Sequence, residues 1–166
     1  MRYFKFKSLI LLLACWIVTG CALMGGSEPK IRHSDNYKIS APQGWKSIAH
    51  KDSDEAYRLP SGAIATLTSS CDHRSEAPLE VLANHPLIGI RNRKIVSRST
   101  KKFNQTEGLW SVVDVQTPEG ALKLNLFVTK YSNCVFDFSL IHPKAISDGD
   151  QDEFKKFISS LEYENS

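Results

Sequence analysis

The hydrophobic pattern of this chain is dominated by strand-like segments. Apolar and polar residues alternate, or apolar residues run together over a short length, which predicts β-strands at residues 37–41, 55–59, 63–69, 95–103, 109–117, 121–131 and 134–141. Two intervals combine proline and glycine, and these predict hairpin turns at Pro60-Ser61-Gly62 and Pro118-Glu119-Gly120. No internal repeat interrupts the pattern.

Helical spacing is found in two segments. Ser75 is a suitable cap for a first helix, which should end near His85-Pro86 because proline disfavours helix in the residue before it. Asp150 and Glu153 have the spacing of a capping box for a second helix. Apolar residues recur at helical spacing in both: Leu79, Leu82 and Ala83 in the first, and Phe154, Phe157, Ile158 and Leu161 in the second.

The order of these elements is strands, helix, several long strands, helix. This order predicts one α+β domain over residues 37–166, in which helices pack on an antiparallel sheet.

The start of this domain, Tyr37 to Trp45 (YKISAPQGW), resembles the start of PsbP-like domains, where a short strand leads into Pro-x-Gly-Trp. The later strands and the C-terminal helix are also similar, so the resemblance covers about residues 37–161. It implies an α/β/α sandwich around an antiparallel sheet, in a family whose members are non-catalytic accessory and assembly proteins. Since fold alone does not transfer function, no functional residue is carried over.

A different signal precedes the domain. Residues 1–20 have a basic start and a short apolar core, as secretory signals do, and they end in Val18-Thr19-Gly20 before Cys21. This order resembles the lipobox of bacterial lipoproteins, which implies cleavage before Cys21 and attachment of lipid to its sulfur. The apolar run is too short for a transmembrane helix, which takes about 20 residues; an ordinary secretory signal is the other alternative.

The anchor predicts the location of the protein in the cell envelope. Residues 21–36 are rich in Gly, Ser, Pro and charge and read as a flexible tether between lipid and domain. Ala22 follows the anchor cysteine where an aspartate favours retention in the inner membrane of enteric-type bacteria, so the resemblance favours the outer membrane.

Charge changes the picture once the signal is removed. The chain has 21 Lys and Arg and 18 Asp and Glu, but three of the bases lie in residues 1–20, so the mature chain is balanced. A nucleic-acid-binding protein is therefore not expected.

Cysteine usage leaves a single pair for a disulfide. Cys15 leaves with the signal and Cys21 takes the lipid, so Cys71 and Cys134 remain in an oxidising compartment. We expect them to form a disulfide; two buried free thiols are the alternative.

Catalytic and metal-binding chemistry has little support. Cys71-Asp72-His73, with Cys134 and His142 distant in sequence, lacks the ligand spacing of a zinc site, and no cofactor is expected. Asp114 and Asp137 interrupt apolar strands and would need to face one cleft to act as an acid–base pair. Trp45 and Trp110 are candidates for the floor of a ligand pocket, although such residues more often belong to the core.

A basic stretch is the main candidate for a binding surface. It comprises Arg91, Arg93, Lys94, Arg98, Lys101 and Lys102. Strand alternation predicts Arg91, Arg93 and Ile95 on one face, and Lys94, Val96 and Arg98 on the other. The stretch suits anionic headgroups or an acidic partner, or it is an edge strand protected by charge.

Three hypotheses for function follow. The first is a lipid-anchored, non-catalytic accessory or assembly subunit that binds an envelope protein. The second is a carrier of a small apolar ligand or lipid, and the third is a weak hydrolase-type enzyme. A filled core favours the first, an apolar tunnel the second, and clustered titratable groups the third.

Overall fold

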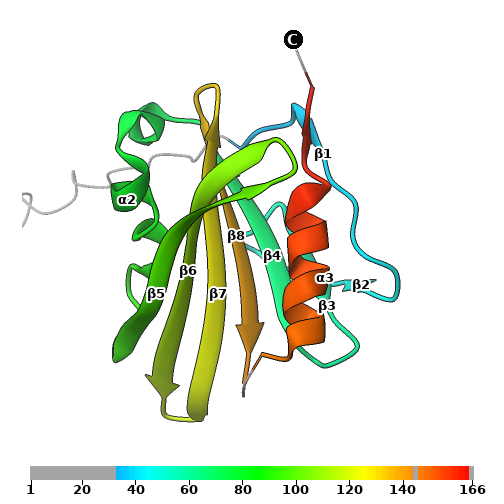
Figure 1. Cartoon of the computed structure of the whole chain (residues 1–166), viewed down its shortest axis with the longest axis vertical. Helices are drawn as coiled ribbons and strands as arrows, with labels where there is room; N and C mark the ends of the chain where they lie inside the picture. The colour runs from blue at the N-terminus through cyan, green and yellow to red at the C-terminus, as the bar shows by residue number, and fades with distance from the viewer. Residues whose placement is uncertain (1–32, 144–145, 165–166) are drawn as a thin grey trace, which may run out of the picture. The chain divides into compact units, whose positions relative to one another are not determined.

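The computed structural model describes residues 33–143 and 146–164, except for the side chains of His73 and Arg74. The predicted signal, the anchor Cys21 and residues 22–32 of the predicted tether lie outside this range. The described part confirms the predicted α+β class: an antiparallel sheet carries helices on both faces (Figure 1).

The main sheet has seven strands in the order β2-β3-β4-β8-β7-β6-β5, and each pair of neighbours is antiparallel. In that spatial order the strands are β2 (Lys46–Ser47), β3 (Glu55–Arg58), β4 (Ile64–Ser70), β8 (Cys134–His142), β7 (Gly120–Tyr131), β6 (Thr106–Thr117) and β5 (Arg93–Phe103). A separate two-stranded sheet pairs β1 (Tyr37–Lys38) with β9 (Glu162–Tyr163). The two ends of the domain are therefore hydrogen-bonded to each other.

One face of the main sheet is covered by α3 (Asp148–Ser159), which lies in front of it in Figure 1. The interface consists of phenylalanine side chains that are 0–1% exposed: Phe127, Phe136 and Phe138 from the sheet, and Phe154 and Phe157 from the helix. The rings of Phe138 and Phe157 meet edge to face, with centroids 5.7 Å apart. Each such side chain contributes about 1.5–3 kcal/mol on burial, so this interface is the main source of stability.

The opposite face is covered by short helical turns. These are η1 (His73–Glu76), α2 (Leu79–Leu82) and η2 (His85–Leu87). Leu82 packs against Leu109, Val128 and Val135, and Leu87 packs against Val113, Val115, Leu124 and Leu126. Both faces of the sheet are thus apolar, which explains why β7 reads as a continuous apolar run near its centre.

The predicted helix starts are wrong in two places. Ser75 does not cap α2 but lies in η1, where its N–H donates to the carbonyl of Asp72 (3.0 Å); α2 begins after Pro78, which has no N–H to place inside a helix. The cap of α3 is Ser147, whose hydroxyl accepts from the N–H of Asp150 (3.1 Å) and donates to its carboxylate (2.8 Å). The helix therefore begins three residues earlier than predicted, and Asp150 holds the third helical position instead of the cap.

Over residues 33–143 and 146–164, no helix combines the length and apolar character that crossing a bilayer requires.

Candidate binding surfaces at the disulfide end and the basic edge

The predicted disulfide joins neighbouring strands at one end of the sheet. Strands β4 and β8 are paired up to Ser70 and Val135, so the next residues, Cys71 and Cys134, lie side by side. Their sulfurs are bonded at 2.04 Å, which confirms the predicted pair. The bond ties the start of η1 to the β7–β8 hairpin.

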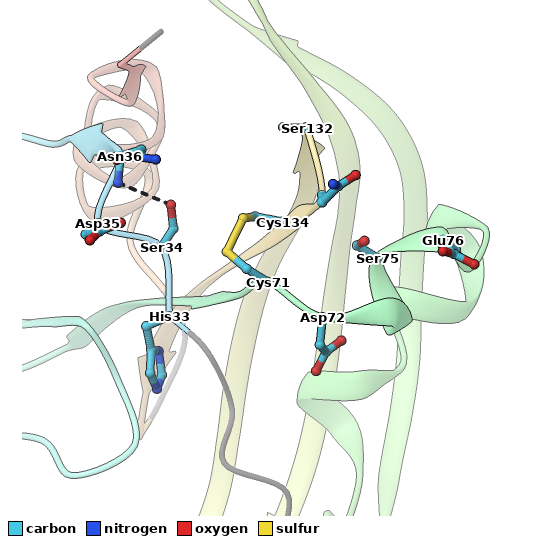
Figure 2. A pocket seen from close by; sticks show the side chains of 11 residues that line it. His33, Ser34, Asp35, Asn36, Cys71, Asp72, Ser75, Glu76, Ser132 and Cys134 are labelled. Carbon is cyan, nitrogen blue, oxygen red and sulfur yellow. Dashed lines mark hydrogen bonds between the residues drawn. A yellow bond between two sulfur atoms is a disulfide. The ribbon is translucent and has the colours of Figure 1, made fainter. Parts of the chain in front are cut away.

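An open pocket of about 400 Å³ surrounds this disulfide (Figure 2). The N-terminal segment forms one wall, η1 forms the other, and the β7–β8 turn closes the top. The lining is polar: His33, Ser34, Asp35, Asn36, Cys71, Asp72, Ser75, Glu76, Ser132, Asn133 and Cys134. With three carboxylates, such a pocket suits a cationic or hydrogen-bonding side chain of a protein better than an apolar ligand.

The N-terminal segment is fixed to the sheet beside this pocket. The N–H of Ser34 donates to the hydroxyl of Ser69 (2.8 Å), and the N–H of Ser69 donates to the carboxylate of Asp54 (2.6 Å). The same carboxylate lies 2.6 Å from the imidazole of His33. Residues 33–36, the end of the predicted tether, therefore contribute to the pocket, a role that their polar composition did not indicate.

A second hollow of about 640 Å³ lies beside α3. Its wall includes Trp45, Pro42 and Pro60, and Lys156 on the helix pairs with Glu153 (2.9 Å). The indole of Trp45 is half-buried against Tyr57 and Phe157, with ring centroids 6.1 and 5.3 Å away. Trp45 therefore packs mainly against core residues and also lines this hollow.

Trp110 lies inside the core, as expected of most such residues. It packs between Phe103 and Phe154, with ring centroids 5.6 and 5.8 Å away, and is 6% exposed. Of the two candidates for a pocket floor, Trp110 is therefore a core residue, whereas Trp45 lines the hollow beside α3.

The residues proposed for a weak enzyme do not converge. Cys71 and Cys134 are joined in the disulfide, so neither sulfur is a free thiolate. His142 ends the nine-residue strand that Cys134 begins, and the strand rise places these two residues about 27 Å apart. The side chain of His73 is outside the described set. No group of three His, Cys, Asp or Glu residues within the described range is arranged to hold a metal ion.

The two aspartates in apolar strands point to opposite faces of the sheet. Asp114 lies on the α3 face, where its carboxylate pairs with Lys123 at 2.8 Å. Asp137 alternates with Phe136 and Phe138, which pack under α3, so it lies on the α2 face. The two carboxylates share no cleft, so the hypothesis that they form an acid–base pair is wrong.

Five of the six bases of the stretch lie on the edge strand β5, and Arg91 precedes it. Within the described part of the chain, β6 is the only sheet partner of β5, and nearly all of the β5 side chains are exposed. The predicted alternation of side chains between the two faces is interrupted at a bulge between Ile95 and Ser97, where Val96 has no partner in the β5–β6 register. The bulge returns Arg98 to the face that carries Arg93 and Ile95, contrary to the sequence prediction.

Two arginines of this stretch also hold the edge together. Arg98 donates to the Ser111 hydroxyl (2.9 Å) and to the Asn84 side chain just after α2 (3.1 Å). Arg93 donates to the carbonyl of Ile90 (2.6 Å). These bonds tie β5 to the α2 and η2 region, so their role is at least partly structural.

Burial raises the pKa of two tyrosines, Tyr37 and Tyr57. Burial, followed by the charge of Asp54, raises the pKa of Tyr37 well above its usual range. Burial and a hydrogen bond to the Glu55 carboxylate (2.7 Å) raise the pKa of Tyr57 to about 12. Both phenols are thus kept neutral, which suits packing roles rather than acid–base chemistry.

Comparison with known proteins shows the fold. No family profile and no curated sequence matches the chain. A protein from Bacteroides thetaiotaomicron is similar in structure with a TM-score of 0.59 and 16% identity, over 78% of this chain and 46% of that one. The chain thus spans about half the length of that protein.

Two further structures match over most of both chains. Cyanobacterial PsbP (CyanoP) from Synechocystis sp. PCC 6803 has a TM-score of 0.55 and 13% identity, over 86% of this chain and 98% of that one. PA94, a protein of unknown function from Pseudomonas aeruginosa, has a TM-score of 0.50 and 12% identity, over 84% and 90%. The expected PsbP-like fold is confirmed, and at these identities the likeness extends to the fold alone.

Proposed function

We propose that this protein is a lipid-anchored, non-catalytic subunit of the bacterial cell envelope that binds another envelope protein. Cys21 carries the anchor, and the outer membrane is the favoured location because Ala22 follows it. Anchoring restricts the domain to a thin layer at the membrane, which raises its effective concentration for a partner in that layer.

The single observation that carries the binding role is the filled interface between the sheet and α3. Phe127, Phe138, Phe154 and Phe157 are each 0% exposed and pack ring against ring. A carrier of an apolar ligand needs a cavity at this position, between sheet and helix. The close packing therefore supports the accessory subunit over the carrier.

The disulfide end is the surface we assign to the partner. Its pocket is open, polar and framed by a covalent bond, and Asp35 and Glu76 expose carboxylates at its rim. A partner that inserts an arginine or lysine here would gain a charge-assisted hydrogen bond. The disulfide and the bonds of Ser34 hold both walls before binding, which lowers the ordering cost.

The test is site-specific photo-crosslinking in cells. A photoreactive residue replaces Asn133 at the pocket, and the matched control replaces Glu119, which is equally exposed at the turn of the β6–β7 hairpin. We expect a crosslink to one protein from position 133, none from position 119, and loss of the crosslink in Cys21→Ala.

Three other outcomes would argue against parts of this proposal. A crosslinked protein from position 119 alone would overturn the assignment to the disulfide end. The absence of any crosslinked protein, with lipid in the purified chain by mass spectrometry, would favour the carrier. Unchanged membrane fractionation of Cys21→Ala after a high-salt wash, which removes proteins held by charge alone, would refute the anchor.

A further inference from the structure

The charge of this protein is unevenly distributed along the chain. Residues 77–103, which we call the basic edge, contain six Lys and Arg and one acid, Glu80. The rest of the predicted mature chain contains 12 Lys and Arg and 17 Asp and Glu. A mature chain with no net charge therefore consists of a positive edge and a negative remainder.

The same edge exposes large apolar side chains. Ile88 is 72% exposed, Val81 53%, Val96 51% and Ile95 42%; outside the edge, the described residues include one other exposed large hydrophobic, Tyr131 at 38%. Exposed apolar groups that gather on one surface mark an interaction site more often than scattered ones do.

Several contacts link η2 and the end of α2 to strand β5 of this edge. Leu87 packs on Val113, which is the sheet partner of Ile95, so η2 and its neighbour Ile88 lie next to Ile95. Arg98 reaches Asn84 at the end of α2, and Arg93 reaches Ile90. In Figure 1, α2 and β5 both lie at the left of the view, and β5 is the last strand at that edge of the sheet.

We propose that the basic edge docks directly onto an anionic phospholipid bilayer. Val81 and Ile88 enter the headgroup layer, and Arg91, Lys94 and their neighbours bind lipid phosphates. Apolar side chains dispersed among bases suit a fluid surface, which adapts to them without a shaped pocket. This inference goes beyond the proposed protein-binding function, because it concerns lipid and a different surface.

A short segment separates the predicted anchor from the domain. Cys21 and His33 are separated by residues 22–32, and an extended chain of this length spans about 40 Å. Contact between the domain and the membrane is therefore compatible with an inserted anchor. When the basic edge is docked, the disulfide pocket has a fixed orientation relative to the membrane.

The test uses lipid alone and an unlipidated chain. Residues 22–166 retain the whole compact unit that begins at Ile31 and lack the anchor cysteine. Vesicles of phosphatidylcholine with phosphatidylglycerol are compared with vesicles of phosphatidylcholine in a sedimentation assay. We expect binding to the anionic vesicles, weakened by salt, and little binding to the neutral ones.

Matched variants locate the surface. Arg91→Gln with Lys94→Gln removes two exposed charges from the basic edge, and Lys46→Gln with Lys51→Gln removes two exposed charges at or next to β2, the opposite edge of the sheet. Since each base near an anionic surface contributes roughly fivefold, the first pair should weaken binding about 25-fold. The second pair should have little effect.

A fluorescent label tests insertion of the apolar side chains. An environment-sensitive dye on Ile88→Cys should shift to the blue on anionic vesicles, whereas the same dye on Ala49→Cys, exposed near β2, should not. Equal losses in the two charge pairs, or equal dye responses, would overturn the assignment to the basic edge. No vesicle binding by the unaltered chain would overturn the proposal, and it would leave the protein-binding function to its own crosslinking test.

Discussion

Removal of the disulfide is the most direct test of how this fold is stabilised. The bond joins Cys71 and Cys134 across 63 residues of sequence. In the chain-entropy model, a cross-link of that length stabilises the folded state by about 4 kcal/mol, because it restricts the unfolded chain. Both cysteines are only half-buried, so their truncation to alanine should leave no closed cavity. A domain of this size has a total stability of about 5–15 kcal/mol, so the loss should be large.

The assay is urea unfolding of the oxidised chain and of Cys71→Ala with Cys134→Ala, followed by tryptophan fluorescence. The variant should lose about 4 kcal/mol and show a steeper transition, because its unfolded state exposes more surface. Reduction of the unaltered chain should give the same stability as the double variant. A difference below about 1 kcal/mol would refute the entropic reasoning at this site. A reduced chain as stable as the oxidised one would also refute this reasoning.

Other predictions concern the core, a helix end and a buried phenol. A Cβ at Gly108 would lie 2.5 Å from a backbone carbonyl oxygen of β7. Gly108→Ala should therefore lower the free energy of unfolding, measured in urea, by about 1–3 kcal/mol. A Cβ at Gly149 in α3 would lie 3.8 Å from its nearest neighbouring atom, so Gly149→Ala should be neutral or stabilise the fold by up to about 1 kcal/mol. Ser147→Ala should cost about 1 kcal/mol and Ser147→Asp, which keeps an acceptor, much less; equal losses would contradict the cap. Burial, followed by the hydrogen bond to Glu55, raises the pKa of Tyr57 from 10.0 to about 12. The contribution of this phenol to stability should therefore be complete below pH 10 and lost as the pH rises toward 12, which ultraviolet titration against Tyr57→Phe will measure.

The long hairpins could be predicted from the sequence because their signal is local. Strands β6 and β7 alternate or run apolar over many residues, and Pro118 and Gly120 mark the turn between them. The disulfide could be predicted because elimination of Cys15 and Cys21 leaves only Cys71 and Cys134. Strand β1 lies within the strand predicted at residues 37–41, whereas β2 and β9 have two residues each and carry no pattern of their own. Their pairing depends on contacts distant in sequence, which a local window does not contain.

The candidate surfaces were predicted only in part. The bases of β5 and its place at the edge were anticipated, but the faces of its side chains were not, because the bulge at Val96 shifts the alternation by one residue. The cysteines of the polar pocket were identified, whereas His33 and Ser34 were assigned to the tether. The exposure of Ile88 has no sequence signal, since it follows from the way η2 lies on the sheet.

The pairing of β1 with β9 has a consequence for the timing of folding. Synthesis proceeds from the N-terminus, so Tyr37 is made long before its partner Tyr163. A shorter delay separates β4 from β8. Contacts between such distant segments form slowly, because a long loop must close first. The domain therefore stays incompletely folded until the residues of β9 have been made.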